Sequence, residues 1–375
     1  MDDVARRRQR PVYRRAAVVA VPVSPALVPR ASDGAPPDGA GPAPAFDTAT
    51  VRRTVWPAFA VGLALFTGLL AWHGVAEVGR ALAVAGAGLL LLPLVHLVPL
   101  TADAIGWRRL LHERPGVGTM VFARWVGESV NGLLPALQIG GNVAKARLLA
   151  SRGVPGITAG ASVVVDVTLV MLTQMAFTLV GLTLLVGRLG GERLLPAALV
   201  GLGLMAMLLV GFVWAQRAGL FAAAARALGA LGRRGPGTAL LGGADALDAA
   251  VRRLHDDRRA LVTAGIWHAA SWLLGVAEVL VALALLGHPV DPWTAVLLES
   301  LGQAVRAAAF VVPGALGVQE GGYLLLGATV GLAPDTALAL SLSRRVRDLL
   351  LGLPGLVAWQ WDAARAPARR RQEGR

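Results

Sequence analysis

Polar residues of the kinds that could do chemistry gather in two short apolar stretches of this chain, 119–150 and 294–333. In the first stretch Glu128, Asn131 and Pro135 recur at i, i+3 and i+7, which places the carboxylate and the amide on one face of a helix that ends at the proline. The chain's only two asparagines and its only lysine also fall there. Such a face can line a polar cavity. The candidate residues of this stretch are Glu128, Asn131, Pro135, Gln138, Asn142 and Lys145.

The second stretch carries a similar polar face and a glycine-rich turn. Glu299, Gln303 and Arg306 recur at i, i+4 and i+7, again on one helical face, and the segment 313–322 follows them. Its glycines allow tight turns and leave backbone amides free to hold a polar group. The candidate residues here are Glu299, Gln303, Arg306, Pro313, Gly317 and Glu320, joined by Asp166, Arg344 and Arg345 on the helices that follow the two stretches.

The surrounding composition is that of a membrane protein: 55% of the 375 residues are apolar and 16% are charged, against about 25% charged in soluble domains. Since about 20 apolar residues form one spanning helix, about six to eight crossings are expected. A soluble enzyme is excluded. The net charge of +13 comes from arginines in tails and loops. That distribution is typical of membrane orientation and contact with anionic headgroups, and not of nucleic-acid binding.

The apolar blocks predict an all-α polytopic membrane protein with six full spans and two re-entrant helical hairpins. A helix of about 18 residues or more can cross the hydrocarbon core, whereas 119–134 reaches only about 24 Å and then meets Pro135. The expected spans are 55–72, 82–105, 157–187, 194–215, 260–287 and 336–361, and the expected hairpins are 119–134 with 136–150 and 294–312 with 315–333.

The positions of the arginines predict the orientation. They cluster on both sides of the first hairpin and in 217–259, which places these segments and both termini in the cytoplasm. Repeats over 82–187 and 260–361 then start on opposite sides of the membrane, as an inverted repeat whose hairpins meet near the midplane. The expected parts are a disordered basic arm over 1–53, a transmembrane domain over 54–362 with a cytoplasmic loop over 217–259, and a basic tail over 363–375.

The ionisable residues of these helices need partners. An ionised side chain at the centre of a membrane helix costs about 3 kcal/mol on insertion scales, so each one implies a partner, a wet cavity or a function. The two modules match at a constant offset of 178 residues, which aligns Glu128 with Arg306 and Asp166 with Arg344. We therefore predict an ion pair between Glu128 and Arg306, and another between Asp166 and Arg344 or Arg345. Two roles stay open for these pairs: holding the halves in register, or handling a substrate directly.

Several kinds of chemistry are excluded. The chain has no cysteine, so thiol catalysis and thiolate metal sites are ruled out. The six histidines form no i, i+3 or i, i+4 pair, and there is no phosphate-binding loop. We therefore assign no catalytic residue, no metal and no cofactor. His96 with Asp103, and His268 with Glu278, lie in apolar helices, where a proton relay is one interpretation and hydrogen-bonded packing the other.

Three stretches carry a resemblance. They are Asn131-Gly-Leu-Leu-Pro135 through Gly140-Gly141-Asn142 to Lys145-Ala-Arg147, then Ser162-Val-Val-Val-Asp166, and Pro313-Gly-Ala-Leu-Gly317-Val-Gln-Glu320-Gly321. Over about 55–362, the chain resembles the flippase-like membrane proteins related to the transmembrane domain of lysylphosphatidylglycerol synthetases. Leu134-Pro-Ala-Leu-Gln-Ile-Gly-Gly and Val165-Asp-Val-Thr are most similar to the branch associated with hopanoid biosynthesis.

The resemblance implies a bacterial inner-membrane protein that moves or presents lipids, with re-entrant helices near the lipid pathway. Two departures matter. Many members carry Asp-Arg where this chain has Asp166-Val167, so an arginine contact to a lipid phosphate is lost on that helix. No synthetase domain follows residue 375, so we expect no aminoacyl transfer to lipid.

We therefore expect a lipid translocase or lipid-handling protein that is not an enzyme, with membrane lipids, hopanoid or anionic, as partners. One alternative is a non-catalytic scaffold that gathers lipid-synthesis enzymes through its basic arm and the 217–259 loop. Another is a membrane-embedded lipid transferase, with Glu128, Asp166 or Glu320 as general base or metal-binding carboxylate.

Overall fold

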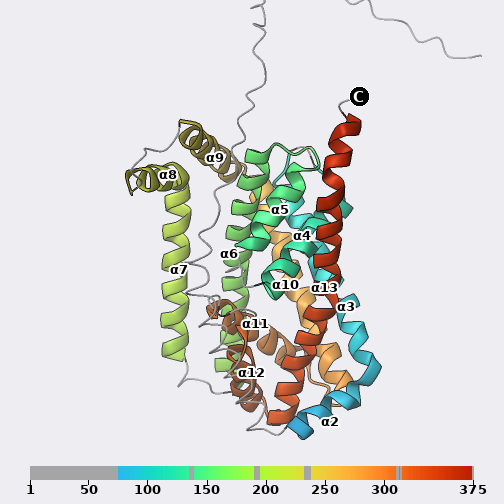
Figure 1. Cartoon of the computed structure of the whole chain (residues 1–375). Coiled ribbons are helices and arrows are strands. Elements are labelled where there is room, and N and C mark those ends of the chain that lie inside the picture. Colours follow the sequence, from blue (N-terminus) through green and yellow to red (C-terminus); the bar gives the residue numbers. More distant parts are fainter. Residues whose placement is uncertain are drawn as a thin grey trace, which may run out of the picture. The chain divides into compact units, whose positions relative to one another are not determined.

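The computed structural model describes residues 75–112, 114–134, 139–189, 195–231, 238–309, 312 and 315–373, and every element within them is a helix (Figure 1). All belong to one unit, Thr48–Arg375. The arm 1–53, the first expected span 55–72, and the candidates Pro135, Gln138 and Pro313 lie outside the described residues. The elements are α2 Val75–Ala85, the 3-10 helix η1 Gly86–Leu90, α3 Leu91–Arg109, α4 Val117–Leu133, α5 Gly140–Ala150, α6 Gly156–Leu189, α7 Leu195–Arg217, α8 Leu220–Leu231, α9 Thr238–Asp256, α10 Arg258–Leu285, α11 Pro292–Ala308, α12 Val318–Thr329 and α13 Pro334–Glu373.

Three stretches of the described chain are long and apolar enough to cross a membrane: Leu82–Arg109, Gly156–Gly187 and Arg258–Leu285. They also expose large apolar side chains, such as Leu172 and Ile266, which a protein surrounded by water would bury. The protein is therefore a multi-pass membrane protein whose described part is all-helical.

The helix expected over 82–105 is interrupted near its start. α2 ends at Ala85, η1 follows, and α3 begins only at Leu91. The cause is Gly86, whose φ of +48° lies in the left-handed region that an α-helix cannot include. Pro93 then falls in the first turn of α3, where its missing N–H breaks no helical hydrogen bond.

The two modules contain the same sequence of helices. α4 and α11 are each 17 residues long. The first residues of α5 and α12 are 178 positions apart, and so are those of α6 and α13. The offset seen in the sequence therefore reappears in the helix boundaries.

The helix contacts are reciprocal. α5 packs on α4 and α6, just as α12 packs on α11 and α13, while α3 packs along α10. Each long helix also receives the other module's hairpin, because α11 packs on α6 and α4 packs on α13. In Figure 1 the α4–α5 pair lies beside the upper part of α6 and the α11–α12 pair beside its lower part. Exchange of this kind is what a twofold relationship between two halves produces.

The segment expected as the loop 217–259 contains two helices, α8 and α9. α9 packs against α6 and α8. Its Asp248 accepts hydrogen bonds from the backbone N–H groups of Phe221, at 3.1 Å, and Ala222, at 2.8 Å, at the start of α8. A carboxylate in this place satisfies amides that have no partner inside the helix. α8 and α9 are therefore packed parts of the fold.

Candidate functional site

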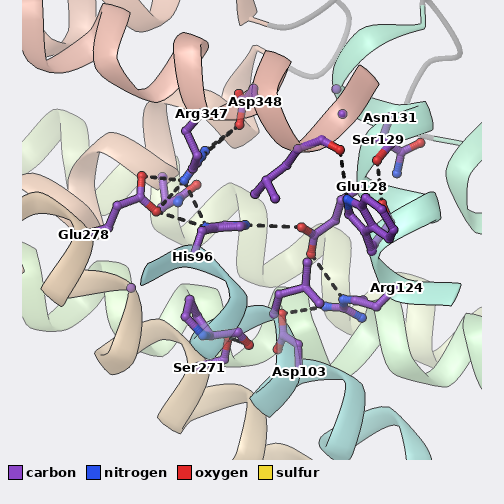
Figure 2. Close-up of a pocket in the computed structure, with 18 of the residues that line it drawn as sticks. His96, Asp103, Arg124, Glu128, Ser129, Asn131, Ser271, Glu278, Arg347 and Asp348 are labelled. Atoms are coloured by element: carbon purple, nitrogen blue, oxygen red, sulfur yellow. Dashed lines mark hydrogen bonds and ion pairs between the residues drawn. The ribbon is translucent and has the colours of Figure 1, made fainter. Parts of the chain in front are cut away.

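A cavity of about 310 Å³ lies where the two modules meet (Figure 2). Its wall comes mainly from α3, α4, α10, α11 and α13. This volume lies within the range of small-molecule sites. The polar side chains of the wall are His96, Asp103, Arg124, Glu128, Ser129, Asn131, Ser271, Glu278, Glu299, Gln303, Arg306, Arg347 and Asp348.

Arg124 on α4 organises one side of the cavity. It donates hydrogen bonds of 2.7 Å to Asp103 on α3 and 2.7 Å to Asp166 on α6, and its Nε lies 3.5 Å from Glu128 one turn later. Lys145 on α5 adds a second cation 3.1 Å from Asp166. Because Asp166 is fully buried, these two cations compensate a charge that the interior would otherwise not tolerate.

His268 on α10 joins the same group from the other module. Its Nδ1 lies 2.7 Å from Asp103, and its Nε2 lies 3.2 Å from Asp166. The imidazole is fully buried. Gly106 allows this approach, since a Cβ at that position would lie 3.2 Å from the His268 ring and 3.1 Å from the Ala264 carbonyl oxygen.

Arg347 on α13 organises the opposite side. Its Nη1 donates to both carboxylate oxygens of Glu278 at 2.5 Å, and its Nη2 donates to Asp348 at 2.6 Å. Asp348 also accepts a hydrogen bond of 2.9 Å from Arg306 on α11. Arg344, one turn before Asp348, is ion-paired with Glu299 and lies 4.0 Å from Glu278. On this side too, carboxylates therefore alternate with positively charged arginines.

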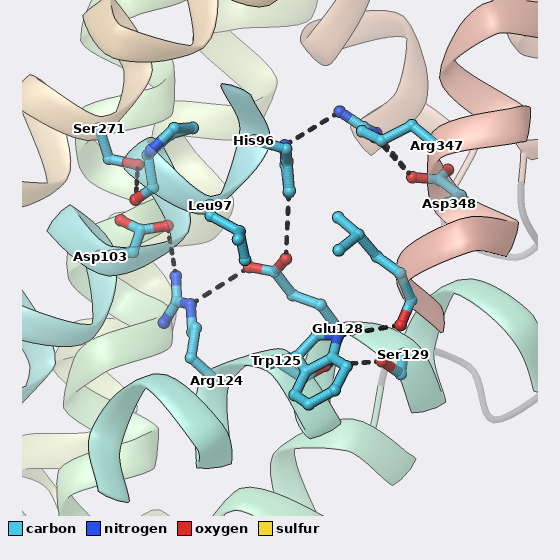
Figure 3. Close-up of polar contacts among 12 residues, drawn as sticks. His96, Leu97, Asp103, Arg124, Trp125, Glu128, Ser129, Ser271, Arg347 and Asp348 are labelled. Atoms are coloured by element: carbon cyan, nitrogen blue, oxygen red, sulfur yellow. Dashed lines mark hydrogen bonds and ion pairs between the residues drawn. The ribbon is translucent and has the colours of Figure 1, made fainter. Parts of the chain in front are cut away.

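His96 on α3 joins the two sides (Figure 3). Its Nε2 lies 3.4 Å from Glu128 and its Nδ1 lies 3.0 Å from Glu278. The Nη1 of Arg347 is 3.1 Å from the same Nδ1. Through this imidazole, the contacts run without a break from Lys145 on α5 to Arg306 on α11.

Exposure distinguishes the members of this network. The side chain of Glu128 is 41% exposed, whereas those of Arg306 and Asp348 are 27% and 24% exposed. Glu278 and Glu299 are buried. Glu128 is thus the carboxylate of the network that a molecule entering the cavity can reach most easily.

Both predicted ion pairs are wrong. Glu128 contacts Arg124 and His96, and Arg306 pairs with Asp348. Asp166 pairs with Arg124, Lys145 and His268, none of which is on α13. Each acid finds a cation in its own module or on the facing spanning helix. The offset of 178 aligned Glu128 with Arg306. A residue four positions away, about one helical turn, lies on the same helical face, so an equal offset does not identify which side chains meet.

Arg344 and Arg345, the predicted partners of Asp166, take partners within the second module. Arg344 is ion-paired with Glu299, and its guanidinium lies 5.7 Å from the centre of the Tyr323 ring. Arg345 pairs with Glu320 at 2.6 Å. Gln303 donates a hydrogen bond of 2.9 Å to Glu299. Both residues line the cavity, on the shared helical face that their spacing predicted.

The glycine-rich turn has a structural arrangement of its own. Gly317 adopts φ +73° and precedes α12, and its N–H donates to Glu320 at 2.7 Å. Glu320 is buried and is not among the residues that line the cavity.

The two asparagines of the first module differ in position. Asn131 lines the cavity and accepts a hydrogen bond of 2.8 Å from the Gly141 N–H, while Asn142 is half-buried on α5.

Sequence reasoning did not select seven members of the network as site residues. The available signal was the cost of burying charge in apolar helices, which marks every ionisable residue there as partnered or functional. Sequence reasoning grouped His96 with Asp103, and His268 with Glu278. In the structure the partners are exchanged: His96 contacts Glu278, and His268 contacts Asp103. The residues are His96, Asp103, Arg124, His268, Glu278, Arg347 and Asp348.

Within the described part of the chain, no group of three or more histidine, aspartate or glutamate side chains is arranged to hold a metal ion. The acids instead face arginine, lysine or histidine. What this arrangement can do is solvate a polar or charged group inside an apolar bundle, because its ionic side chains can replace water as hydrogen-bond partners.

Residues 59–355 match the protein family described as the lysylphosphatidylglycerol synthase TM region. No curated protein and no solved structure gives a significant match. The family match covers more than three quarters of the chain, including every residue that lines the cavity. The chain therefore belongs to the family of the lysylphosphatidylglycerol synthase transmembrane region.

Proposed function

We propose that this protein moves lipids across the bilayer, with the headgroup passing through the cavity while the acyl chains stay in hydrocarbon. The observation that carries the proposal is an ion-lined cavity of about 310 Å³ in a bundle that exposes large apolar side chains on its outside. A headgroup needs polar partners and acyl chains need an apolar surface. This fold offers both at once.

Family membership supports a lipid-related role, because the family is named after a synthase whose product is a lipid. We assign no catalytic step to this chain. Hopanoids and anionic phospholipids are the lipid classes proposed from the sequence, and both belong in the first test.

The membrane topology is part of the proposal. We propose six spans, two re-entrant hairpins and cytoplasmic termini in the bacterial inner membrane. α4 and α11, at 17 residues each, are about 25 Å long, which is shorter than the hydrocarbon core of about 30 Å. α5 and α12, at 11 and 12 residues, are shorter still. Their length supports helices that enter and return.

The test is transbilayer movement of tail-labelled lipids in proteoliposomes that contain the full-length protein. The lipids are a hopanoid, phosphatidylglycerol and phosphatidylethanolamine. Wild type should accelerate the movement of at least one of them over protein-free vesicles. Glu128→Gln should slow that movement about tenfold or more, as expected for loss of a charged hydrogen-bond partner.

The matched control is Asp245→Asn, which also removes one carboxylate but lies on the exposed surface of α9, away from the cavity. It should move lipids at the wild-type rate. If wild type moves none of the lipids faster than protein-free vesicles, translocation is refuted. The scaffold and the transferase then become the functions to test, the scaffold by deleting its basic arm.

A further inference from the structure

The ionic network around the cavity is balanced in charge. Within the described part of the chain, its ion pairs connect six carboxylates with six positive side chains, one of which is His268. Both ring nitrogens of His268 face carboxylate oxygens, Asp103 at 2.7 Å and Asp166 at 3.2 Å. Because a carboxylate only accepts hydrogen bonds, both nitrogens carry a proton. The carboxylates are Asp103, Glu128, Asp166, Glu278, Glu299 and Asp348, and the other cations are Arg124, Lys145, Arg306, Arg344 and Arg347.

His96 adds no charge to this balance. The Nη1 of Arg347 lies 3.1 Å from its Nδ1 and also donates to Glu278 at 2.5 Å. Since a guanidinium only donates, Nδ1 is an acceptor, and the proton of the ring is on Nε2, which faces Glu128 at 3.4 Å. The wall is therefore neutral before a headgroup enters. A headgroup with a net charge would add an unbalanced charge inside an apolar bundle, a cost that an uncharged headgroup avoids.

The most accessible charged groups of the wall can form further hydrogen bonds without giving up their ion pairs. The side chains of Glu128, Arg306 and Asp348 are 41%, 27% and 24% exposed. A carboxylate accepts several hydrogen bonds and a guanidinium donates several, so each has capacity beyond its present partners. A hydroxyl group both donates and accepts, so it can bind to either kind. An ammonium or a phosphate would instead compete with the existing pairs for their charged members.

Two amides of the wall offer the same mixture of donors and acceptors. Asn131 accepts a hydrogen bond of 2.8 Å from the Gly141 N–H through its Oδ1, so its amide nitrogen remains a donor for the cavity. Gln303 donates to Glu299 through its Nε2, so its Oε1 remains an acceptor. Donors and acceptors thus alternate around the cavity, as hydroxyl groups require.

Tryptophan rings add apolar surface beside these polar groups. Trp125 and Trp272 both line the cavity and are half-buried. Their indole N–H groups already donate, to the Leu351 carbonyl oxygen at 2.9 Å and to the Thr173 hydroxyl at 3.1 Å, so they offer the cavity the carbon surface of the ring. Trp125 lies next to Glu128 (Figure 3). A sugar has apolar C–H faces and a rim of hydroxyls, so it fits an aromatic ring beside a hydrogen-bonding side chain.

We propose that the headgroup which this cavity accepts is uncharged and rich in hydroxyl groups, and has the size of a single sugar. The volume of about 310 Å³ is at the lower end of the range for small-molecule sites, which suits one sugar better than a chain of sugars. This inference rests on the proposed lipid movement and narrows its substrates. Of the lipid classes proposed from the sequence, it makes the anionic phospholipids the poorer ones.

The experiment compares three lipids with the same labelled acyl chain in vesicles that contain the full-length protein. Glucosyl diacylglycerol is uncharged and carries hydroxyls, phosphatidylglycerol carries hydroxyls and a negative charge, and phosphatidylcholine has neither a net charge nor a headgroup hydroxyl. Access of the label to a membrane-impermeant quencher reports transbilayer movement. After subtraction of protein-free vesicles, the glucosyl lipid should move about tenfold or more faster than either of the others.

Free glucose separates the lipid from its headgroup alone. A free sugar carries the same hydroxyls but has no acyl chains to remain in hydrocarbon. Vesicles that contain the protein should therefore take up radiolabelled glucose no faster than protein-free vesicles.

Two substitutions change the charge of the wall in opposite directions. Glu128→Gln removes a negative charge and Arg306→Gln removes a positive one, and glutamine keeps a hydrogen-bonding side chain in both. Relative to the glucosyl lipid, phosphatidylglycerol should move about tenfold faster in Glu128→Gln than in Arg306→Gln. A purely structural defect would slow all lipids alike and leave this ratio unchanged. The matched control, Asp245→Asn on the exposed surface of α9, should keep the wild-type ratio.

The outcomes separate the two proposals. If wild type moves phosphatidylglycerol or phosphatidylcholine as fast as the glucosyl lipid, the inferred headgroup is wrong and lipid movement stands. If wild type moves no lipid at all, both are wrong. Uptake of glucose above that of protein-free vesicles would assign the cavity to a soluble sugar and overturn the lipid headgroup. If either variant fails to fold, the wild-type comparison of the three lipids still decides the question.

Discussion

Arg124 on α4 donates a hydrogen bond of 2.7 Å to Asp166 on α6, 42 residues further along the chain. The second module contains its counterpart, because Arg306 on α11 pairs with Asp348 on α13 across the same separation of 42 residues. The two pairs are related by an offset of 182, one helical turn more than the offset of the helix starts. In each module an ion pair therefore links the first helix of the hairpin to the long helix that follows the hairpin.

The two counterpart pairs should differ in energy, because they differ in burial. Asp166 is fully buried, whereas Arg306 and Asp348 are each about a quarter exposed. Removing one partner of a buried pair costs about 3–5 kcal/mol, and an exposed pair contributes about 0–1 kcal/mol. Asp166→Asn should therefore lower the unfolding temperature in detergent far more than Arg306→Gln, which leaves Asp348 paired with Arg347 at 2.6 Å. Equal shifts for the two variants would contradict this ranking.

The α4–α5 contact leaves no room for a side chain at Gly141. A Cβ there would overlap the carbonyl oxygen of Gly127 and approach the Oδ1 of Asn131 to 2.6 Å. Gly141→Ala should therefore destabilise the hairpin by about 1–3 kcal/mol, as overpacking does. Gly118→Ala is the control, since a Cβ at Gly118 meets nothing within 4 Å. Thermal unfolding of both variants decides the matter: an unchanged midpoint for Gly141→Ala means that the helices can separate at no cost.

Local composition was enough to predict the spans whose signal is continuous. α6 and α10 contain long apolar runs, and their bounds fall within two residues of the predicted 157–187 and 260–287. The interruption at Gly86 escaped prediction because a positive φ depends on how the chain must turn. The helices α8 and α9 escaped because an arginine-rich segment resembles a loop in composition.

The location of the site could be predicted, but not its contacts. Glu128, Glu299 and Arg306 do line one cavity, because spacing along a helix determines which face they share. Which residue each of them meets depends on the rotation and depth of the facing helix. The partner of Glu128 from beyond its own helix is His96 on α3, and not Arg306 on α11. Spacing along one helix does not determine which facing helix supplies the partner.

The stability of α9 should depend on pH through His255. This imidazole is buried, and its Nδ1 donates to the Val251 carbonyl oxygen at 3.0 Å. Burial lowers the pKa of His255 below its ordinary value of 6.5. The unfolded segment therefore binds the proton more readily, so the stability is complete above a pH of about 6.5 and is lost as the pH falls through the lowered pKa.

Hydrogen–deuterium exchange over 238–256, corrected for the intrinsic effect of pH, measures this. Exchange should speed up on acidification in wild type and respond less in His255→Gln. His112→Gln serves as control, because His112 is exposed. An identical pH response in wild type and His255→Gln would assign the effect to other groups.

Glu320 should stabilise the fold without selecting the lipid. Its carboxylate accepts hydrogen bonds from the Gly317 N–H at 2.7 Å and from Arg345 at 2.6 Å and 3.0 Å, which ties the start of α12 to α13. Glu320→Gln should cost about 1.5–3 kcal/mol, the value of a charged hydrogen bond, and lower the unfolding temperature. Lipid movement per folded molecule, and the preference among lipids, should not change.

Glu128→Gln should slow lipid movement without lowering stability, because Glu128 is exposed to the cavity and its loss leaves the packing between helices in place. Its unfolding temperature should stay near that of wild type while lipid movement slows. Measuring both quantities on both variants separates a residue that supports the site from one that meets the headgroup. A stable but inactive Glu320→Gln protein would place Glu320 on the lipid pathway, since loss of packing could then no longer explain the loss of movement.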